Sequence, residues 1–280
     1  MKITGIIPAR YGSSRFPGKP LAMLNGRPML FTVFEQASRS RLLAELFVAT
    51  ESPLIEEACR QEGIPVLMTS PDHENPTSRL CEAAKKTDSE LHVMIGGDEP
   101  LLTGSDIDST VRQALKLSRS PEPLFPGRED LAAGVRSGLF VVNAMAPVSS
   151  PAEAMDTTNI KVVCGDFGVG LYTSRFPVPY PKGSLNFTYR KFASIGVYTR
   201  EALRFFEETP RGMLETIEEC DLLRFMEKGV PVFFIDTGHP SLSVDTRKDL
   251  AEVSRMLTSG GTETAVSGSC TSHRFYFTED

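Results

Sequence analysis

Three cations lie within ten residues near the start of the chain, in a segment that is also rich in serine and glycine. Arg10, Arg15 and Lys19 share this segment with Ser13 and Ser14, and a short apolar run precedes it. Backbone N–H groups and positive side chains after a strand form a receptor for a polyanion, commonly a nucleotide phosphate. The segment is not a Walker loop, because five residues separate its two glycines and a proline follows its lysine. The alternative is a surface loop whose charges are solvated.

Two aspartates that are far apart in sequence are candidates for holding a hard cation. Asp98 follows the apolar run 92–95, and Asp245 follows Val244. Mg²⁺ is held by one or two protein carboxylates together with substrate phosphates, so this pair suits a phosphate-binding site. Taken singly, each aspartate could instead cap a turn or a helix.

The elements that must position these residues alternate between strand and helix in the first half of the chain. This alternation predicts a mostly parallel sheet with right-handed crossovers and a ligand crevice outside the carboxyl ends of its strands. Arg10 and Asp98 both follow expected strands, so they should meet at that edge. The expected strands are 3–8, 46–50, 64–68 and 92–95, and the expected helices are 28–38, 53–62, 79–86 and 105–117.

The second half begins after a proline-rich break at 118–127 and changes to a β-type pattern from Val135 onward. Small and polar residues dominate 258–280, so we expect a disordered tail there. The expected strands are 138–143, 160–164, 168–173, 192–198 and 232–235, and the expected helices are 200–208, 214–228 and 247–257.

Taken together and in order, the motifs of this chain resemble those of the 3-deoxy-manno-octulosonate (KDO) cytidylyltransferases. The resemblance runs over about residues 1–257 and implies an α/β fold with a mostly parallel, Rossmann-like sheet of nucleotidyltransferase type and a smaller β-rich insertion. It implies a single domain over 1–257, with a nucleotide-binding half (1–117) and an acceptor-binding and dimerisation half (128–257). The segments that carry it are Ile6 to Leu30, Met68 to His73, Gly97 to Pro100, Tyr172 to Arg175, Ile195 to Tyr198, and Val244 to Thr246.

The resemblance implies transfer of CMP from CTP to KDO or a similar small sugar acid, with release of pyrophosphate by a homodimer. Arg10, Arg15, Lys19 and Asp98 would then act in catalysis, and Asp98 and Asp245 would hold Mg²⁺. The helix that carries Glu215 and Glu218 also matches, although a solvated helix face is the alternative there. Further substrate contacts are implied for Ser13, Ser14, Thr77, Arg79, Gly97, Arg175, Tyr198, Glu215 and Glu218.

The loop expected to hold the cytidine end of CTP departs from the family pattern. Thr77 and Arg79 match, but Pro76 stands where the family has glycine and Ser78 where it has an acid. A proline fixes φ and removes an N–H, so we expect altered contacts to the base. His73 in the same loop is as well explained by a local hydrogen bond as by a functional role.

The acceptor half departs further. Gly96 stands where the family has glutamine, and Ala193 and Ser194 stand where it has a cation and a histidine. These losses leave open a different acceptor, such as another keto-sugar acid or a phosphonate. If KDO is the acceptor, other groups must replace them, and the nearest candidates in sequence are Lys182, Arg190 and Lys191.

Composition narrows the alternatives. The chain of 280 residues is 40% hydrophobic and 24% charged, and its net charge of −6 argues against broad nucleic-acid binding. Five cysteines without a Cys-x-x-Cys spacing indicate reduced thiols, and no apolar run approaches membrane-spanning length, so we expect a cytoplasmic protein without membrane or nucleic-acid partners. The other function classes left open are a nucleotide-binding protein without catalysis and a sugar-1-phosphate nucleotidyltransferase.

Overall fold

The computed structural model describes residues 1–12, 16–119, 125–183 and 187–258. Within them the apolar runs of the sequence form strands that gather into one large sheet and one short hairpin. The strands are β1 (Ile3–Pro8), β2 (Met23–Leu24), β3 (Arg27–Pro28), β4 (Glu45–Thr50), β5 (Val66–Met68), β6 (Leu91–Ile95), β7 (Val141–Pro147), β8 (Lys161–Cys164), β9 (Gly170–Ser174), β10 (Arg190–Thr199) and β11 (Val232–Asp236).

The main path of the sheet has the order β11-β7-β10-β6-β1-β4-β5. Its neighbours are parallel except at β10, which runs antiparallel to both β6 and β7. β8 extends one end of β10 and pairs with β9, which forms the smaller β-rich part of the sheet. The expected α/β class and mostly parallel sheet are therefore confirmed.

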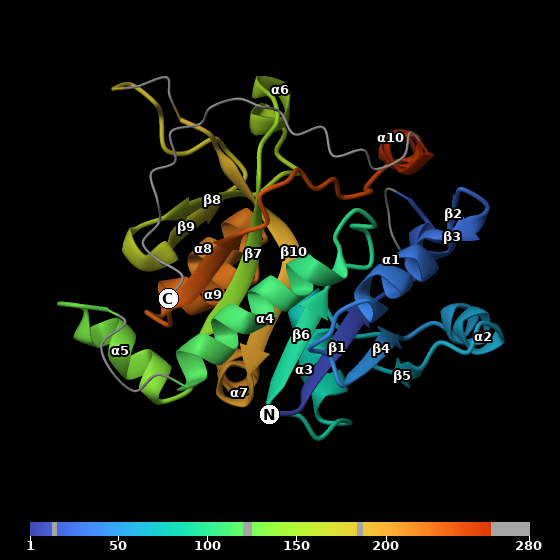
Figure 1. Ribbon diagram of the computed structural model, residues 1–280, viewed down its shortest axis with the longest axis horizontal. Helices are drawn as coiled ribbons and strands as arrows, with labels where there is room; N and C mark the ends of the chain where they lie inside the picture. The colour runs from blue at the N-terminus through green and yellow to red at the C-terminus, as the bar shows by residue number, and fades with distance from the viewer. Residues whose placement is uncertain (13–15, 120–124, 184–186, 259–280) are drawn as a thin grey trace.

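Helices cover both faces of the sheet (Figure 1). One core lies between the sheet and the helices α1, α2, α4 and α5, and a second lies between the sheet and α3, α7, α8 and α9. The helices are α1 (Met29–Ser38), α2 (Pro53–Gln61), α3 (Pro76–Ala84), α4 (Gly104–Arg119), α5 (Glu129–Arg136), α6 (Pro151–Met155), α7 (Arg200–Glu208), α8 (Met213–Glu218), α9 (Leu222–Glu227) and α10 (Arg247–Thr258), with 3₁₀ turns at Lys19–Leu21 and Asp166–Gly168.

A third, smaller core lies near the N-terminal loop and fixes two segments that are distant in sequence. Phe16, before the first 3₁₀ turn, and Val244 are both buried in it, together with Val253 of α10. Because Phe16 is three residues from Lys19 and Val244 directly precedes Asp245, this packing brings the cationic loop and the second aspartate to one place.

Three expectations about local structure are wrong. The helix expected over 214–228 is two helices, since Glu219 between α8 and α9 has a left-handed φ of 49°. The β-type pattern expected from Val135 fails at its start, because Val135 packs its side chain into the core from helix α5. The helix expected from Arg79 begins at Pro76, where the missing N–H is harmless at a first helical position.

Two other expectations fall largely outside the described residues. The proline-rich break at 118–127 includes the undescribed 120–124, and its first residues belong to α4. The tail expected at 258–280 lies outside them except for Thr258, which ends α10. None of the described helices is long and apolar enough to span a membrane.

Candidate active site

A cavity of about 890 Å³ opens at the carboxyl ends of β1 and β6 and extends over the face of the sheet that α3 and α9 cover. It is the kind of crevice that the strand order predicts. Ser13, Ser14 and Arg15 lie outside the described residues. The other predicted site residues that line the cavity are Arg10, Lys19, Thr77, Arg79, Gly97, Asp98, Arg175, Tyr198 and Asp245.

Lys19 lies between the two candidate metal ligands. Its Nζ is 2.7 Å from Asp98 Oδ2 and 3.3 Å from Asp245 Oδ1. The main chain holds this arrangement, because the Val244 N–H donates to the Asp98 carbonyl at 2.8 Å and the Gly18 N–H donates to the Tyr11 carbonyl at 3.0 Å. Two carboxylates that share one cation are suitably placed to share another, so this pair fits Mg²⁺.

The acid next to Asp98 is a buried anchor that sequence reasoning did not single out. Glu99 Oε1 accepts hydrogen bonds from the Ser194 N–H (2.9 Å) and hydroxyl (2.5 Å), and Oε2 accepts one from the Ser241 hydroxyl (2.5 Å). Burial raises the pKa of Glu99, and these hydrogen bonds oppose that shift. Glu99 thus ties Asp98 to β10 and to the segment that leads to Asp245. Its place between Asp98 and Pro100 was the signal available in the sequence.

Gly96 and Ser194 are in close contact where β6 and β10 meet. The Gly96 N–H donates to the Ser194 carbonyl at 2.7 Å, and a Cβ added at Gly96 would lie 2.4 Å from Ser194 Cβ. No side chain fits at position 96 unless Ser194 moves. Two of the departures noted in the acceptor half are therefore one coupled change.

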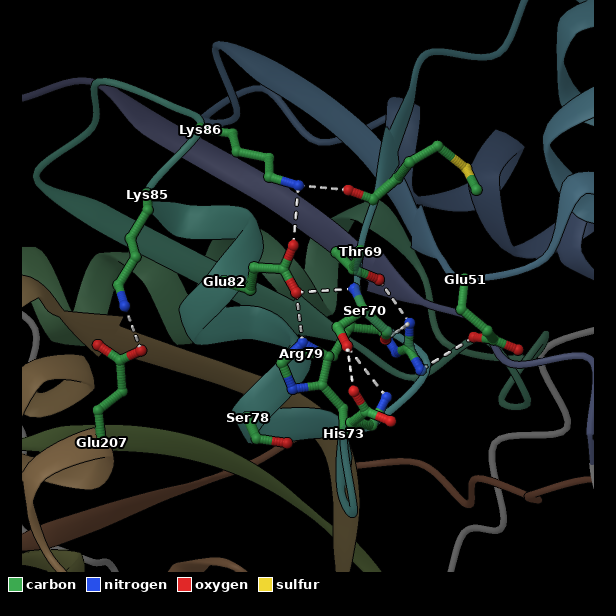
Figure 2. Close-up of polar contacts among 12 residues, drawn as sticks. Glu51, Thr69, Ser70, His73, Ser78, Arg79, Glu82, Lys85, Lys86 and Glu207 are labelled. Atoms are coloured by element: carbon green, nitrogen blue, oxygen red, sulfur yellow. Dashed lines mark hydrogen bonds and ion pairs between the residues drawn. The ribbon is translucent and has the colours of Figure 1, made fainter.

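Arg79 is held by contacts with Thr69 and Glu51 (Figure 2). Its guanidinium donates to the Thr69 hydroxyl at 2.5 Å and pairs with Glu51 Oε2 at 2.9 Å. Glu51 in turn accepts the N–H of Tyr11 at 3.0 Å. Because Arg79 is 4% exposed, its larger role is to fix the expected base-binding loop and the cationic loop relative to each other.

The departures in the base-binding loop have a local explanation. Asn75 caps α3 by accepting the Ser78 N–H at 2.8 Å, and Pro76 occupies the first helical position. His73 lies 2.6 Å from Glu82, which makes it a partner in the loop's own hydrogen bonds. Burial alone would raise the pKa of Glu82, but hydrogen bonds from Lys86, Ser70 and His73 lower it to about 2.

Buried hydroxyl groups line the cavity on the α3 and α9 side. Tyr198 and Thr77 are both fully buried, and the Thr77 side chain lies beside both Tyr198 and Asp221. Beside them, the Thr77 N–H donates to Asp221 at 3.3 Å, and burial raises the pKa of Asp221.

Arg175 lies on the wall of the same cavity. Its guanidinium donates to the carbonyls of Glu218 (2.7 Å), Thr157 (2.9 Å) and Glu219 (3.4 Å). Within the described part of the chain, no carboxylate forms an ion pair with this guanidinium, and main-chain carbonyls hold it in place. The Glu218 carboxylate positions Arg175 through its main chain. It accepts hydrogen bonds from the main-chain N–H of Arg175 at 2.8 Å and from the Tyr172 hydroxyl at 3.2 Å.

The structure does not bring Glu215 or Glu218 to the cavity wall. Both carboxylate oxygens of Glu215 bind Arg224 at 2.7 Å, and Glu215 is only 1% exposed. The guanidinium of Arg224 also lies over the Phe206 ring at 3.7 Å. Glu215 therefore joins α8 to α9 across the break at Glu219, and Glu218 positions Arg175.

The expected substitutes for the missing acceptor cation are not at the site. Lys191 is 3% exposed and pairs with Glu153 at 2.6 Å, and Arg190 pairs with Asp236. Lys182 is exposed, and none of the three lines the cavity. These three cations are near the expected site in sequence, but the sequence does not show that Glu153 pairs with Lys191 and Asp236 with Arg190.

A histidine–carboxylate pair braces the segment between β11 and Asp245. His239 Nε2 lies 2.9 Å from Asp106 Oδ1, and this hydrogen bond raises the pKa of His239 above 6.5. The stabilisation is therefore fully present below pH 6.5 and is lost as the pH rises through the folded pKa. We expect His239→Ala to lower the free energy of unfolding by about 0.5–1 kcal/mol at about pH 5.5, and by less at about pH 9. Urea denaturation at both pH values measures this, and an equal loss at both would contradict it.

Comparisons with known proteins agree with this geometry. Residues 4–234 match a family model described as cytidylyltransferase. The chain is 33% identical over 252 residues to the 3-deoxy-manno-octulosonate cytidylyltransferase of Escherichia coli, which covers 90% of this chain and 94% of the relative. It is 33% identical over 260 residues to the 8-amino-3,8-dideoxy-manno-octulosonate cytidylyltransferase of Shewanella baltica strain OS195, which covers 92% and 99%.

A solved structure of a CMP:2-keto-3-deoxy-manno-octonic acid synthetase in complex with CTP matches this fold with a TM-score of 0.79 and 32% identity, over 92% of this chain and 99% of that one. The structural match and the sequence matches thus cover nearly the same part of the chain and indicate the same kind of enzyme. The chain therefore belongs to the cytidylyltransferase family, as its motifs predicted, and is a nucleotidyltransferase.

Proposed function

We propose that this enzyme moves CMP from CTP to a small acidic acceptor, with a KDO-like sugar acid as the leading candidate, and releases pyrophosphate. The observation that carries the proposal is the cluster in which Lys19 bridges Asp98 and Asp245, on the wall of a cavity that also holds the guanidinium of Arg175. The cavity would thus bind the phosphates of CTP at the Lys19 cluster and the acidic acceptor at Arg175. Relatives at 33–36% identity, named for KDO and for its 8-amino form, support the acceptor class.

In the proposed reaction, an acceptor hydroxyl attacks the α-phosphorus of CTP in line with the departing pyrophosphate. Such a transfer depends mainly on positioning and on neutralising charge. Arg10 and Lys19, together with Arg15 of the same loop, would hold the triphosphate, and Ser13 and Ser14 would offer hydroxyl and backbone donors. Gly97 lets its backbone lie close to the end of β1, since a Cβ at position 97 would be 3.1 Å from the Pro8 carbonyl oxygen.

Asp98 and Asp245 would hold Mg²⁺, which when bound supplies positive charge to the phosphate oxygens. Glu99, which accepts hydrogen bonds from Ser194 and Ser241, would hold the segments that carry these two aspartates together. We further propose a homodimer, a division into a nucleotide half (1–117) and an acceptor half (128–257), and a cytoplasmic location.

Gly96, Ala193 and Ser194 differ from the family pattern, so acceptors other than KDO are tested as well. A keto-sugar acid other than KDO, or a phosphonate, would also present an anion to Arg175. The direct experiment measures pyrophosphate release with CTP, Mg²⁺ and a panel of such acids, with ATP, GTP and UTP as controls. Release with a sugar acid and CTP supports the proposal. Firm CTP binding without release for any acid would favour a non-catalytic nucleotide binder, and preference for UTP with a sugar 1-phosphate would favour that other enzyme class.

Arg175 provides a test of the acceptor end. Arg175→Lys keeps the charge but loses the planar donors that three carbonyls hold in place. We expect the KM for the acceptor to rise about tenfold, the energy of one charged hydrogen bond, while the KM for CTP changes little. Steady-state kinetics with each substrate varied in turn measures both. A rise in the KM for CTP alone would place Arg175 at the nucleotide end instead.

A further inference from the structure

One lysine occupies the point on which the two candidate metal ligands converge. Lys19 Nζ lies within ion-pair distance of both Asp98 and Asp245, and the lysine side chain is 15% exposed. The two aspartate side chains are 31% and 21% exposed, so the cluster opens toward the cavity. An ammonium in this position neutralises the same oxygens that a divalent cation would use.

We propose that Lys19 is a built-in counter-ion for Asp98 and Asp245 in the free enzyme, and that CTP prepares the site for Mg²⁺ by drawing Lys19 onto its phosphates. The inference rests on the proposed function, because it takes CTP as the nucleotide. It adds that the enzyme binds the metal strongly only when nucleotide is present.

The charges of the cluster support this order. The two carboxylates and the ammonium of Lys19 carry a single net negative charge between them. A divalent cation added beside Lys19 would face a like charge at close range, where Coulomb repulsion is strong because water is partly excluded. A triphosphate brings several negative charges, which would take up both the lysine and the metal. Coupling of this kind is reciprocal, so the metal also strengthens nucleotide binding.

The local backbone allows the side chain to move without unfolding the loop. Gly18 has a φ of +69° and its N–H binds the Tyr11 carbonyl, and the 3₁₀ turn Lys19–Leu21 follows with Pro20 buried. These contacts fix the Cα of Lys19, whereas its flexible four-carbon stem can redirect the ammonium. The required change is therefore a rotation of one side chain.

The test measures Mn²⁺ binding in the absence of nucleotide, by the electron paramagnetic resonance signal of free Mn²⁺. Lys19→Met removes the ammonium and keeps the length of the side chain. We expect Lys19→Met to bind Mn²⁺ at least about tenfold more tightly than the wild type. We also expect Mn²⁺ to raise the melting temperature of this variant more than that of the wild type. Lys19→Arg keeps the charge and serves as the matched control, with affinity close to that of the wild type.

Equal Mn²⁺ affinity in Lys19→Met and the wild type would overturn the inference. A gain that persists in the double variant Lys19→Met/Asp98→Asn would overturn it as well, because the metal would then be at another place. If Lys19→Met does not fold, Lys19→Gln makes the same measurement. Wild-type pyrophosphate release is assayed in parallel. Turnover without the Mn²⁺ effect refutes only the counter-ion role, and the Mn²⁺ effect without turnover refutes only the proposed reaction.

Discussion

Replacing Asp98 with asparagine should lower kcat for CMP transfer by about 10²–10³-fold, the loss typical of removing one group that stabilises transition-state charge. Asparagine keeps the size of the side chain but not its charge, so the pair with Lys19 at 2.7 Å and the capacity to hold Mg²⁺ are both weakened. Pyrophosphate release at saturating CTP and acceptor measures kcat. Mn²⁺ affinity in the presence of CTP should fall in the same variant.

Asp108→Asn is a matched control for the loss of one buried carboxylate. Asp108 is 4% exposed and binds the Ser40 hydroxyl and the Arg41 N–H, away from the cavity. This variant should lose stability but keep its kcat. If Asp98→Asn retained wild-type kcat, Asp98 would be a turn-capping residue, which is the alternative that the sequence left open.

The positions of the candidate phosphate-binding and metal-binding residues could be predicted because they depend on local pattern. Arg10 and Asp98 each follow an apolar strand, and parallel strands bring their carboxyl ends to one edge. The structure places both on the same cavity, together with Lys19. The short length of these apolar runs, their β-branched residues and the Gly or Pro beside them distinguish them from buried helix segments.

The contacts across the sheet could not be predicted in the same way. Gly96 and Ser194 meet because β10 is inserted, in reverse direction, between β6 and β7. The alternation of strands and helices gives no register for such an insertion, so the sequence showed two separate departures where the structure has one contact. Non-local register is set by packing, which no short pattern encodes.

The role of Glu215 was obscured by a different cause. Periodicity across 214–228 favours one continuous helix, in which Glu215 and Arg224 would be more than two turns apart. The left-handed residue Glu219 breaks that helix and folds α9 back toward α8, and the acid then reaches the arginine at 2.7 Å. A single non-glycine residue with positive φ has no clear signature in the sequence.

The close contact between Gly96 and Ser194 predicts that a side chain added at position 96 will lower activity. A Cβ at position 96 would lie 2.4 Å from Ser194 Cβ, 2.9 Å from its Oγ and 3.2 Å from Asp98 Oδ1. Overpacking of this kind costs about 1–3 kcal/mol. The strain falls on the segment that carries Asp98, so we expect Gly96→Ala to lower kcat/KM for the acceptor by about tenfold to hundredfold. Pyrophosphate release with the acceptor varied at saturating CTP measures this change.

The double variant Gly96→Ala/Ser194→Gly tests the steric cause. Ser194→Gly removes the clashing Cβ and keeps the N–H that Glu99 accepts, so it should recover most of the activity that Gly96→Ala loses. The single Ser194→Gly variant is the reference, and non-additivity of about 1 kcal/mol or more would demonstrate the contact. The family's own pair, glutamine at 96 and histidine at 194, carries two Cβ atoms and meets the same overlap on this backbone. We therefore expect Gly96→Gln/Ser194→His to turn over KDO more slowly than the parent, and faster turnover would show that β6 and β10 can separate to accept the larger residues.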